Sequence, residues 1–304
     1  MIIWRIHKLR NVRAILFLLF AYSSCYASVV PQVFLDRVVA IGRIETNPGP
    51  MHGQWIYEAS GFLYGDFISK ANDKENAYML YLVTNRHVIE EHIAATTGPL
   101  FVKANLKSGE AARAFEVDLV AQGKPLWRGH QNPAIDLAVI RLNAPSLVQS
   151  GVKFDGFHSE SDLLSRDKAK ELGLSEGDSV FVLGFPMGIV GHEQNYVIVR
   201  HGVIARIQDT LQSPSNTTFL IDAFIFPGSS GSPVVLKPEF MSIQGTSSIS
   251  QAYLLGVVKG YLPYIDVAMS VQTKRPRVTF EENSGLAEVI PAYYVEEAIK
   301  DYDK

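Results

Sequence analysis

The chain has 304 residues, of which 47% are hydrophobic and 19% are charged, with 23 glycines, 15 prolines and one cysteine. This composition excludes a disordered, collagenous or polytopic membrane protein and indicates one globular body. The 28 basic and 31 acidic residues give a net charge of −3. Because the basic excess of a nucleic-acid-binding protein is missing, we expect no nucleic-acid partner.

The first 27 residues have the layout of a secretory signal. Four basic residues precede an apolar run over 14–21, and small side chains lie one and three positions before a cut after Ala27. The pattern predicts a cleaved signal over residues 1–27 and export to the periplasm or the medium. Two alternatives stay open from the residues, an uncleaved membrane anchor and lipid attachment at Cys25, and either would tether the chain to a membrane through this N-terminus.

Cleavage would change the charge and the redox chemistry of the chain. Loss of residues 1–27 leaves 24 basic and 31 acidic residues, a net charge of −7, and no cysteine. The mature chain would then tolerate an oxidising compartment without disulfides. Thiol catalysis and cysteine-ligated metal are also excluded for it.

Short apolar runs separated by Gly, Pro, Asn and Asp fill the rest of the chain. They lie at 38–44, 78–84, 137–142, 180–183, 196–207, 219–225 and 253–258. Such runs predict strands of an antiparallel barrel or sandwich. Helical periodicity is limited to 159–172 and 292–301, and the second would pack back onto the strands. The basic cluster at 273–277 is typical of an exposed, solvated loop.

A histidine and an aspartate each lie at the end of an apolar run. His87 follows the strand-like segment Tyr81-Leu82-Val83-Thr84, and Asp136 comes directly before the apolar segment 137–142. A strand end can aim an imidazole accurately, and a buried carboxylate needs a hydrogen-bonding partner such as an imidazole. From the residues alone, a structural histidine and a turn aspartate remain open interpretations.

A third segment joins glycines and serines between two predicted strands. Phe226-Pro227-Gly228-Ser229-Ser230-Gly231-Ser232 can point backbone N–H groups inward, as acyl transfer requires beside a nucleophilic hydroxyl. Ser230 is the candidate because Gly228 and Gly231 frame it, whereas Ser229 lacks that framing. A plain Gly/Ser turn is the alternative.

The order of these segments is informative. His87, Asp136 and Ser230 follow one another in the order of the chymotrypsin-type triad. The order extends to a longer series of segments along the chain. In sequence they are Ala59-Ser60-Gly61-Phe62, Thr84-Asn85-Arg86-His87-Val88, Asp136-Leu137-Ala138-Val139, Gly184-Phe185-Pro186-Met187-Gly188, Gly202-Val203-Ile204, Asp222-Ala223, Leu255-Gly256-Val257-Val258 and Gly285-Leu286-Ala287. Through them the chain resembles the trypsin-like serine peptidases, especially the bacterial HtrA (Deg) branch, over almost its whole length after residue 27.

The resemblance implies an all-β fold of two six-stranded antiparallel β-barrels with a C-terminal helix. One peptidase domain would cover 28–304, with halves at roughly 28–150 and 175–304 and the active site between them. His87 and Asp136 would come from the first half and Ser230 from the second, while the N–H groups of Gly228 and Ser230 would form the oxyanion hole. The implied activity is hydrolysis of peptide bonds in a protein or peptide substrate through an acyl-enzyme, without metal or organic cofactor.

The chain also departs from that branch. HtrA-type proteases carry PDZ domains after the peptidase unit, whereas this sequence stops at Lys304, so we expect a stand-alone peptidase. Ser232 occupies a position where many relatives have Gly, a change we do not interpret as inactivating. The six remaining histidines outside the signal are expected to be surface or packing residues, namely His52, His92, His130, His158, His192 and His201.

Specificity is predicted from the position six before Ser230, where trypsins resemble one another in carrying Asp. Phe224 stands there, which argues against cleavage after Lys or Arg. Together with Val257 and Val258 it predicts a pocket for a small or aliphatic side chain, although the neighbouring Lys259 complicates this assignment.

Two alternatives to an endopeptidase remain open from the sequence. The first is a catalytically idle binding protein on the same scaffold, because a fold does not guarantee chemistry. The second is a serine esterase, against which Ser230 lacks the G-x-S-x-G context and the chain lacks alternating strands and helices.

Overall fold

The computed structural model describes residues 30–45, 50–72, 75–95, 98–191, 193–239, 243, 248–300 and 302. The predicted signal over 1–27, with Cys25, lies outside the described residues, as does His192. Residues 33–304 form one compact unit, within which the site lies. Among the described residues, no helix is long and apolar enough to cross a membrane.

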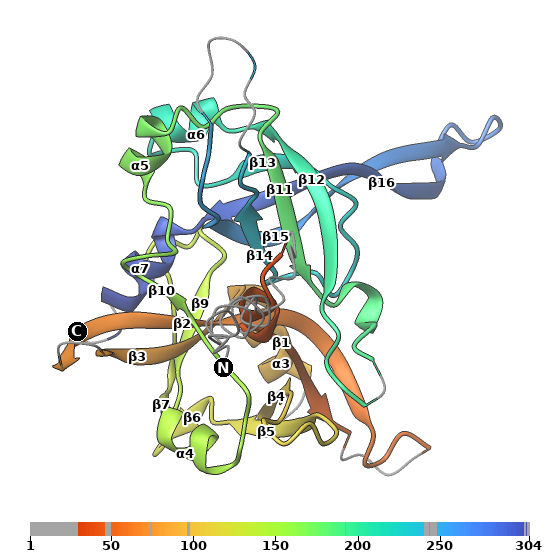
Figure 1. The fold of residues 1–304 in the computed structure, drawn as a ribbon. Helices are drawn as coiled ribbons and strands as arrows, with labels where there is room; N and C mark the ends of the chain where they lie inside the picture. The colour runs from red at the N-terminus through yellow and green to blue at the C-terminus, as the bar shows by residue number, and fades with distance from the viewer. Residues whose placement is uncertain are drawn as a thin grey trace, which may run out of the picture. The chain divides into compact units, whose positions relative to one another are not determined.

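The first half of this unit is an eight-stranded sheet (Figure 1). Its strand order is β5-β4-β1-β2-β3-β9-β8, and β10 pairs with β2 off this path. The strands are β1 (Val38–Ile44), β2 (Trp55–Asn72), β3 (Glu75–Thr84), β4 (Leu100–Ala104), β5 (Arg113–Val117), β8 (Trp127–Gly129), β9 (Ala138–Arg141) and β10 (Phe157–His158). The short strands β6 (Val120–Ala121) and β7 (Lys124–Pro125) form a separate pair.

The second half is a closed six-stranded barrel, in the order β11-β12-β13-β16-β15-β14. It contains β11 (Ser179–Gly184), β12 (Ile198–Arg206), β13 (Phe219–Asp222), β14 (Pro233–Leu236), β15 (Tyr253–Met269) and β16 (Pro276–Pro291). The closed barrel and the all-β class confirm the prediction for this half. In the first half, pairing among the described strands runs from β5 to β8, and these two strands lie at the ends of the order.

Helices are short and lie between or after the strands. They are α2 (Gln32–Asp36), α3 (Arg86–Ala95), α4 (Ala144–Gln149), α5 (Arg166–Glu171), α6 (Gln208–Gln212), the 3-10 turn η1 (Pro186–Gly188) and α7 (Tyr293–Lys300). The predicted terminal helix is α7, whose Val295, Ala298 and Ile299 are buried on one face. The predicted helix at 159–172 is confirmed only as α5, capped by Ser165, whose side chain accepts from the Lys168 N–H at 3.2 Å.

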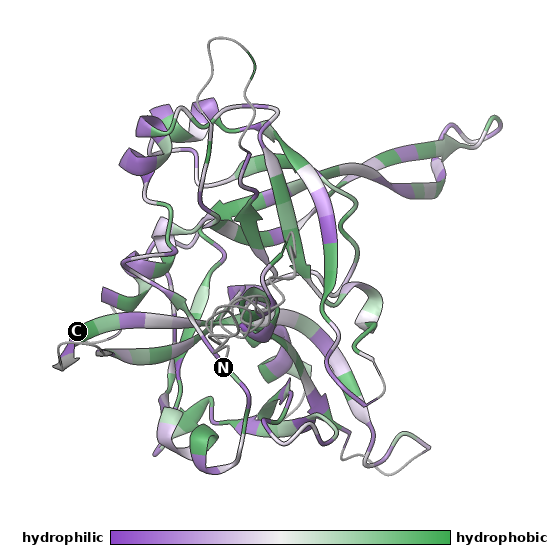
Figure 2. Cartoon of the chain, in the orientation of Figure 1, coloured by the Kyte–Doolittle hydropathy of each residue, from purple (hydrophilic) through white to green (hydrophobic). Residues whose placement is uncertain are grey.

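Each half has its own hydrophobic core. Inward residues of β1, β2, β3, β4 and β9 share the first core, and those of β11 to β16 share the second. Figure 2 shows that β11 and β14 in the second half are hydrophobic along much of their length, whereas α5 and α6 are largely hydrophilic. Burial of these side chains is the main stabilising term, since the described residues contain no cysteine.

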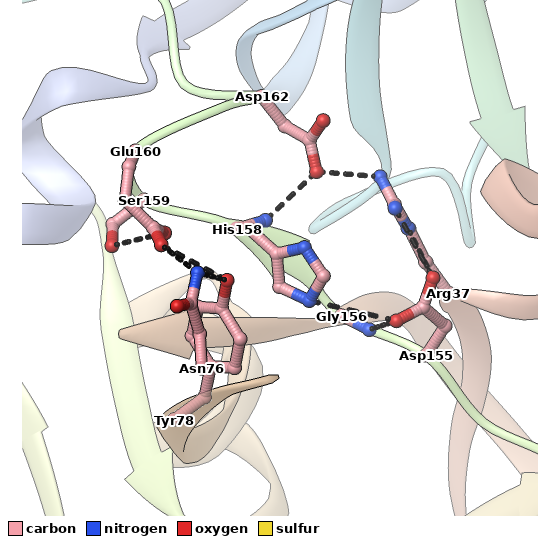
Figure 3. Close-up of polar contacts among 9 residues, drawn as sticks. All are labelled: Arg37, Asn76, Tyr78, Asp155, Gly156, His158, Ser159, Glu160 and Asp162. Atoms are coloured by element: carbon pink, nitrogen blue, oxygen red, sulfur yellow. Dashed lines mark hydrogen bonds and ion pairs between the residues drawn. The ribbon is translucent and has the colours of Figure 1, made fainter. Parts of the chain in front are cut away.

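Arg37, directly before β1, forms ion pairs with the segment that connects the two halves (Figure 3). Its guanidinium donates to Asp162 Oδ2 at 2.8 Å and to Asp155 Oδ2 at 3.1 Å. It also lies 4.8 Å from the ring centroids of both Phe34 and Phe157. The charge is therefore buried with two carboxylates and two aromatic faces around it, an arrangement that suits the planar Arg side chain.

Two hairpins are much longer than the apolar runs predict. β2 and β3 pair from Phe62 with Val83 out to Asn72 with Glu75, and β15 and β16 pair out to Met269 with Pro276. The cluster at 273–277 lies at the end of the second hairpin and is exposed, as predicted, although Pro276 and Arg277 belong to β16.

Candidate active site

His87 lies in the first turn of α3, directly after β3. The strand ends at Thr84, whose hydroxyl donates to the Ser60 carbonyl at 2.9 Å, and Asn85 follows with no exposed surface. The Asn85 side chain donates to the backbone carbonyl of Asp136 at 2.9 Å. These buried contacts fix the strand-to-helix step, so the direction in which His87 leaves the backbone is set by the fold.

Asp136 binds His87 twice. Its Oδ1 accepts the backbone N–H of His87 at 2.9 Å, and its Oδ2 lies 2.6 Å from the ring Nδ1. The carboxylate thereby places the proton of a neutral imidazole on Nδ1 and leaves Nε2 as the basic nitrogen. The structure thus brings together two predicted residues that are 49 positions apart.

The charge state of His87 follows from its neighbours. Burial by itself lowers the pKa of His87, but the hydrogen bond to Asp136 and the charges of Asp136 and Glu91 outweigh it, and the pKa is raised above its ordinary value. Lys259 acts in the opposite direction. The imidazolium that forms when His87 accepts a proton is therefore stabilised.

Ser230 lies in the glycine-containing loop between β13 and β14, and both halves hold this loop. The Ser230 carbonyl accepts from the Ser60 N–H at 3.0 Å, and the Gly231 N–H donates to the Val258 carbonyl at 3.0 Å. Gly231 has φ +81°, and a Cβ there would overlap the Ser60 carbonyl. Only glycine fits this position, which explains why a glycine directly follows Ser230 in the sequence.

Gly228 shapes the predicted oxyanion hole. The Phe226–Ser229 turn is closed by the Ser229 N–H donating to the Phe226 carbonyl at 3.0 Å, and Gly228 has φ +93° in it. The Pro227 carbonyl accepts from the Met187 N–H at 2.8 Å. Because C=O and N–H point in opposite directions across a trans peptide, the Gly228 N–H points away from Met187.

The two predicted oxyanion donors make no hydrogen bond to the residues that the structure describes. Within the described part of the chain, neither the Gly228 N–H nor the Ser230 N–H has a hydrogen-bond acceptor. The Gly228 carbonyl is held from the other half, where the Tyr57 hydroxyl donates at 2.6 Å and the Ser60 hydroxyl at 2.9 Å. Other backbone groups thus hold the loop, while the N–H groups of Gly228 and Ser230 remain available to a ligand.

His87 and Ser230 line one cavity of about 360 Å³, together with Pro227 and Gly228. The Ser230 Oγ donates to the Lys259 carbonyl at 3.3 Å, and no hydrogen bond joins it to His87 among the described residues. The serine side chain has three staggered rotamers, so rotation about one bond redirects its Oγ. Catalytic hydrogen bonds commonly form only when substrate is bound.

The predicted specificity pocket is not formed by its three residues. Val257 and Val258 have no exposed surface, and Val258 belongs to the barrel core. Adjacent strand residues face opposite sides, so both sides of β15 are covered at this point. Phe224 is 57% exposed and stacks on Phe226, with 6.4 Å between ring centroids. This placement corrects the assignment of Val257 and Val258 to an open pocket.

Sequence reasoning missed the charged side chains that line the cavity beside His87. They are Arg43, Glu58, Glu91 and His92. His92 is only 2% exposed, and its Nδ1 lies 2.8 Å from Glu58 Oε2. Burial raises the pKa of Glu58, but hydrogen bonds from His92 and Arg43 outweigh it, so the pKa is lowered. His92 was predicted as a surface or packing residue, and its contact with Glu58 gave no sequence signal.

No group of three His, Cys, Asp or Glu side chains is placed to hold a metal ion in the described ranges. The chemistry that the site offers comes from the imidazole, the carboxylate, the hydroxyl and the free backbone donors. These are the groups that acyl transfer uses.

Comparison with known proteins agrees with this fold. The family model described as trypsin-like peptidase domain matches residues 59–239, more than half of the chain. The chain therefore belongs to the trypsin-like peptidase family. The match includes the three segments that carry His87, Asp136 and Ser230.

A solved structure to which the chain is similar is the apo form of the MamO protease domain from Magnetospirillum magneticum. The two are 16% identical, and the match covers 87% of this chain and 96% of that one with a TM-score of 0.42. A search of curated proteins finds no match to this chain.

Proposed function

We propose that the protein is a serine endopeptidase in which Ser230 is the nucleophile, His87 the general base and acid, and Asp136 the residue that orients His87. The observation that carries the proposal is the double hold of Asp136 on His87, at 2.9 Å to the backbone N–H and 2.6 Å to Nδ1. It leaves a basic Nε2 in a residue that shares a cavity with Ser230 and Gly228.

Acylation starts when the Ser230 Oγ attacks the carbonyl carbon of the scissile peptide. The Oγ proton passes to His87 Nε2, and the carbonyl oxygen becomes an oxyanion that accepts from the N–H groups of Gly228 and Ser230. When the tetrahedral intermediate collapses, the C–N bond breaks and His87 gives the proton to the leaving amine. The acyl group remains on Ser230 as an ester.

Deacylation repeats the sequence with water. His87 takes a proton from the water molecule as it attacks the ester carbonyl, and then returns that proton to the Ser230 Oγ as the ester bond breaks. Asp136 stabilises the imidazolium twice in each cycle. The products are a carboxylic acid and an amine, with the enzyme regenerated.

We also propose that the protein acts outside the cytoplasm, because the first 27 residues have the charge, apolar run and small residues of a secretory signal. An uncleaved anchor or a lipid on Cys25 would place the same domain on a membrane surface. The HtrA-like segments support a kinship with that branch. Mass analysis of the N-terminus of the exported protein separates these three forms.

A second candidate is a catalytically idle binding protein on the same scaffold. The observation that favours it is the hydrogen bond of the Ser230 hydroxyl to the Lys259 carbonyl, at 3.3 Å, in place of one to His87. If this rotamer persists with substrate present, the hydroxyl cannot pass its proton to the imidazole. The serine esterase has no such structural observation in its favour.

Degradation of unfolded casein by the purified full-length protein tests the proposal. Ser230→Ala should abolish it, whereas Ser229→Ala, at the adjacent buried serine, should keep at least a tenth of the activity. Ester hydrolysis without casein cleavage would instead identify an esterase. If the wild-type protein cleaves neither substrate while binding casein, the idle scaffold replaces the proposal.

A further inference from the structure

The hairpin of β15 and β16 extends away from the barrel to which it belongs (Figure 1). Beyond Leu262 and Asn283 its residues are exposed on both faces, except for the half-buried Ser270, and they include Tyr264 at 59%, Val271 at 84% and Phe280 at 52%. An isolated two-stranded ribbon is marginally stable in water, and this one presents large apolar side chains to solvent. The hairpin therefore has the properties of a contact surface.

Charges are sorted along the hairpin from its turn into β16. Lys274, Arg275 and Arg277 lie at the distal end, while Glu281 and Glu282 lie nearer the barrel. Val278, Thr279 and Phe280 separate the two groups. Among the described residues, none of the three basic side chains takes part in an ion pair, and Glu281 accepts only from the Tyr261 hydroxyl, at 2.8 Å.

One edge of β16 is unpaired over the same residues. β13 pairs with β16 only from Leu286 to Val289, so within the described chain the edge over Pro276–Glu282 faces no strand. Its backbone N–H and C=O groups are free to continue the sheet. The outer edge of β15 is a poorer template, because it contains Pro263 and its one charge in this stretch is Asp266.

We propose that the partner of this surface is a second copy of the chain, bound by antiparallel pairing of β16 with β16 about a two-fold axis at Thr279. In this register Arg277 faces Glu281 of the second copy, Glu281 faces its Arg277, and Val278 faces its Phe280. A two-fold interface repeats each contact, so one attractive pair occurs twice. Opposite charges directly across a strand pair are stabilising, and like charges are destabilising.

The register explains the sorting of the charges. Arg277, from the distal basic group of one hairpin, meets Glu281 of the other, and Val278 and Phe280 meet beside the axis. Two ribbons become one four-stranded sheet, which removes two free edges and gives each ribbon more neighbours. Because each hairpin projects from its barrel, the two barrels would lie at opposite ends of this sheet. The dimer is independent of catalysis, so Ser230→Ala should dimerise like the wild type.

Charge reversal tests the pairing in the full-length protein. Sedimentation velocity over a concentration series should show a monomer–dimer equilibrium for the wild type. Arg277→Glu and Glu281→Arg should each raise the dimer Kd about tenfold or more, because each change makes two like-charge contacts. An equimolar mixture of the two variants should dimerise again, since every contact in the mixed pair is then complementary.

The mixture controls for misfolding, because two variants with misfolded hairpins would not regain dimer formation when mixed. A variant carrying both Arg277→Glu and Glu281→Arg should also dimerise alone. Wild-type protein that remains monomeric at high concentration would overturn the proposal, as would single variants that dimerise normally. Hairpin-dependent binding of the monomer to vesicles of anionic phospholipid would instead assign the basic tip to a membrane surface.

An engineered disulfide between the two copies tests the position of the two-fold axis at Thr279. In a Cys25→Ser background, Thr279→Cys should form a disulfide-linked dimer under mild oxidation, because the two residues face each other across the antiparallel pair. Gln272→Cys, at the far end of the hairpin, is the matched control and should not. Equal crosslinking of the two variants, or none at Thr279→Cys, would contradict the proposed axis.

Discussion

Tyr57 donates its hydroxyl hydrogen bond to the Gly228 carbonyl at 2.6 Å, although 171 positions separate the two residues. Tyr57 belongs to the first half of the domain and Gly228 to the loop of the second that carries Ser230. The same tyrosine limits the space at Gly228, where a Cβ would approach its ring to 2.6 Å. The contact therefore couples the position of the predicted oxyanion donor to the packing of the other half.

Tyr57→Phe should lower kcat about tenfold and leave KM within a factor of two or three. The ring still fills its space, but the Gly228 carbonyl loses one of two donors, so the loop is held less firmly when the oxyanion forms. Steady-state kinetics on a peptide substrate measures this. An unchanged kcat would show that the Ser60 hydroxyl alone positions the loop.

Gly228→Ala should reduce kcat by about 10² or more, because φ +93° and the Tyr57 ring both exclude a side chain there. The peptide must rotate to relieve the contact, and the N–H then leaves the oxyanion position. Gly260→Ala is the matched control, since a Cβ there meets no atom within 4 Å. Similar losses in the two variants would contradict a specific role for Gly228.

The acid limb of kcat/KM should have its midpoint above the ordinary histidine value of about 6.5. His87 acts as a base only when neutral, and its raised pKa means that a higher pH is needed to deprotonate it. Asp136→Asn should lower kcat by about 10³–10⁴ and move this limb to lower pH. A limb that stays in place in that variant would show that another group controls it.

Lys259 and Glu91 should shift the same limb in opposite directions. Lys259 lowers the pKa of His87 and Glu91 raises it, so Lys259→Met should move the midpoint up and Glu91→Gln should move it down. Both shifts should shrink as salt is added, because the charges are screened. A pH–rate series on the two variants checks the signs, and shifts of equal sign would contradict the assignment.

Arg37→Ala should lower the free energy of unfolding by about 3–5 kcal/mol, because it leaves Asp155 and Asp162 without their buried cation. Arg37→Lys should recover only part of this loss, since an ammonium group cannot lie flat between Phe34 and Phe157 while bridging both carboxylates. Urea unfolding monitored by circular dichroism gives the difference. If Arg37→Lys had the wild-type free energy of unfolding, the positive charge alone would account for the stabilisation by Arg37.

The sequence predicted the features that are local in the chain. The strand that ends at Thr84, the aspartate before 137–142 and the glycines around Ser230 each leave a short pattern, and their order indicated one site. The contacts of Tyr57 and Ser60 with Gly228 left none, because they join residues at least 168 positions apart.

The burial of some apolar residues and the length of one hairpin also escaped prediction. Consecutive apolar residues such as Val257 and Val258 give the same sequence pattern whether they line a pocket or fill a core. Only the packing of the folded barrel shows that these two are buried. The length of the β15–β16 hairpin was missed because polar and charged residues interrupt its apolar pattern.

The most direct measurement of the central claim is to treat the full-length protein with a fluorophosphonate and locate the adduct by peptide mass analysis. The phosphonate mimics the tetrahedral intermediate, so it reacts only where a hydroxyl, a base and oxyanion donors act together. A single adduct on Ser230, absent in His87→Ala, is the predicted result. An adduct on another residue, or labelling of Ser230 that does not depend on His87, would contradict the account.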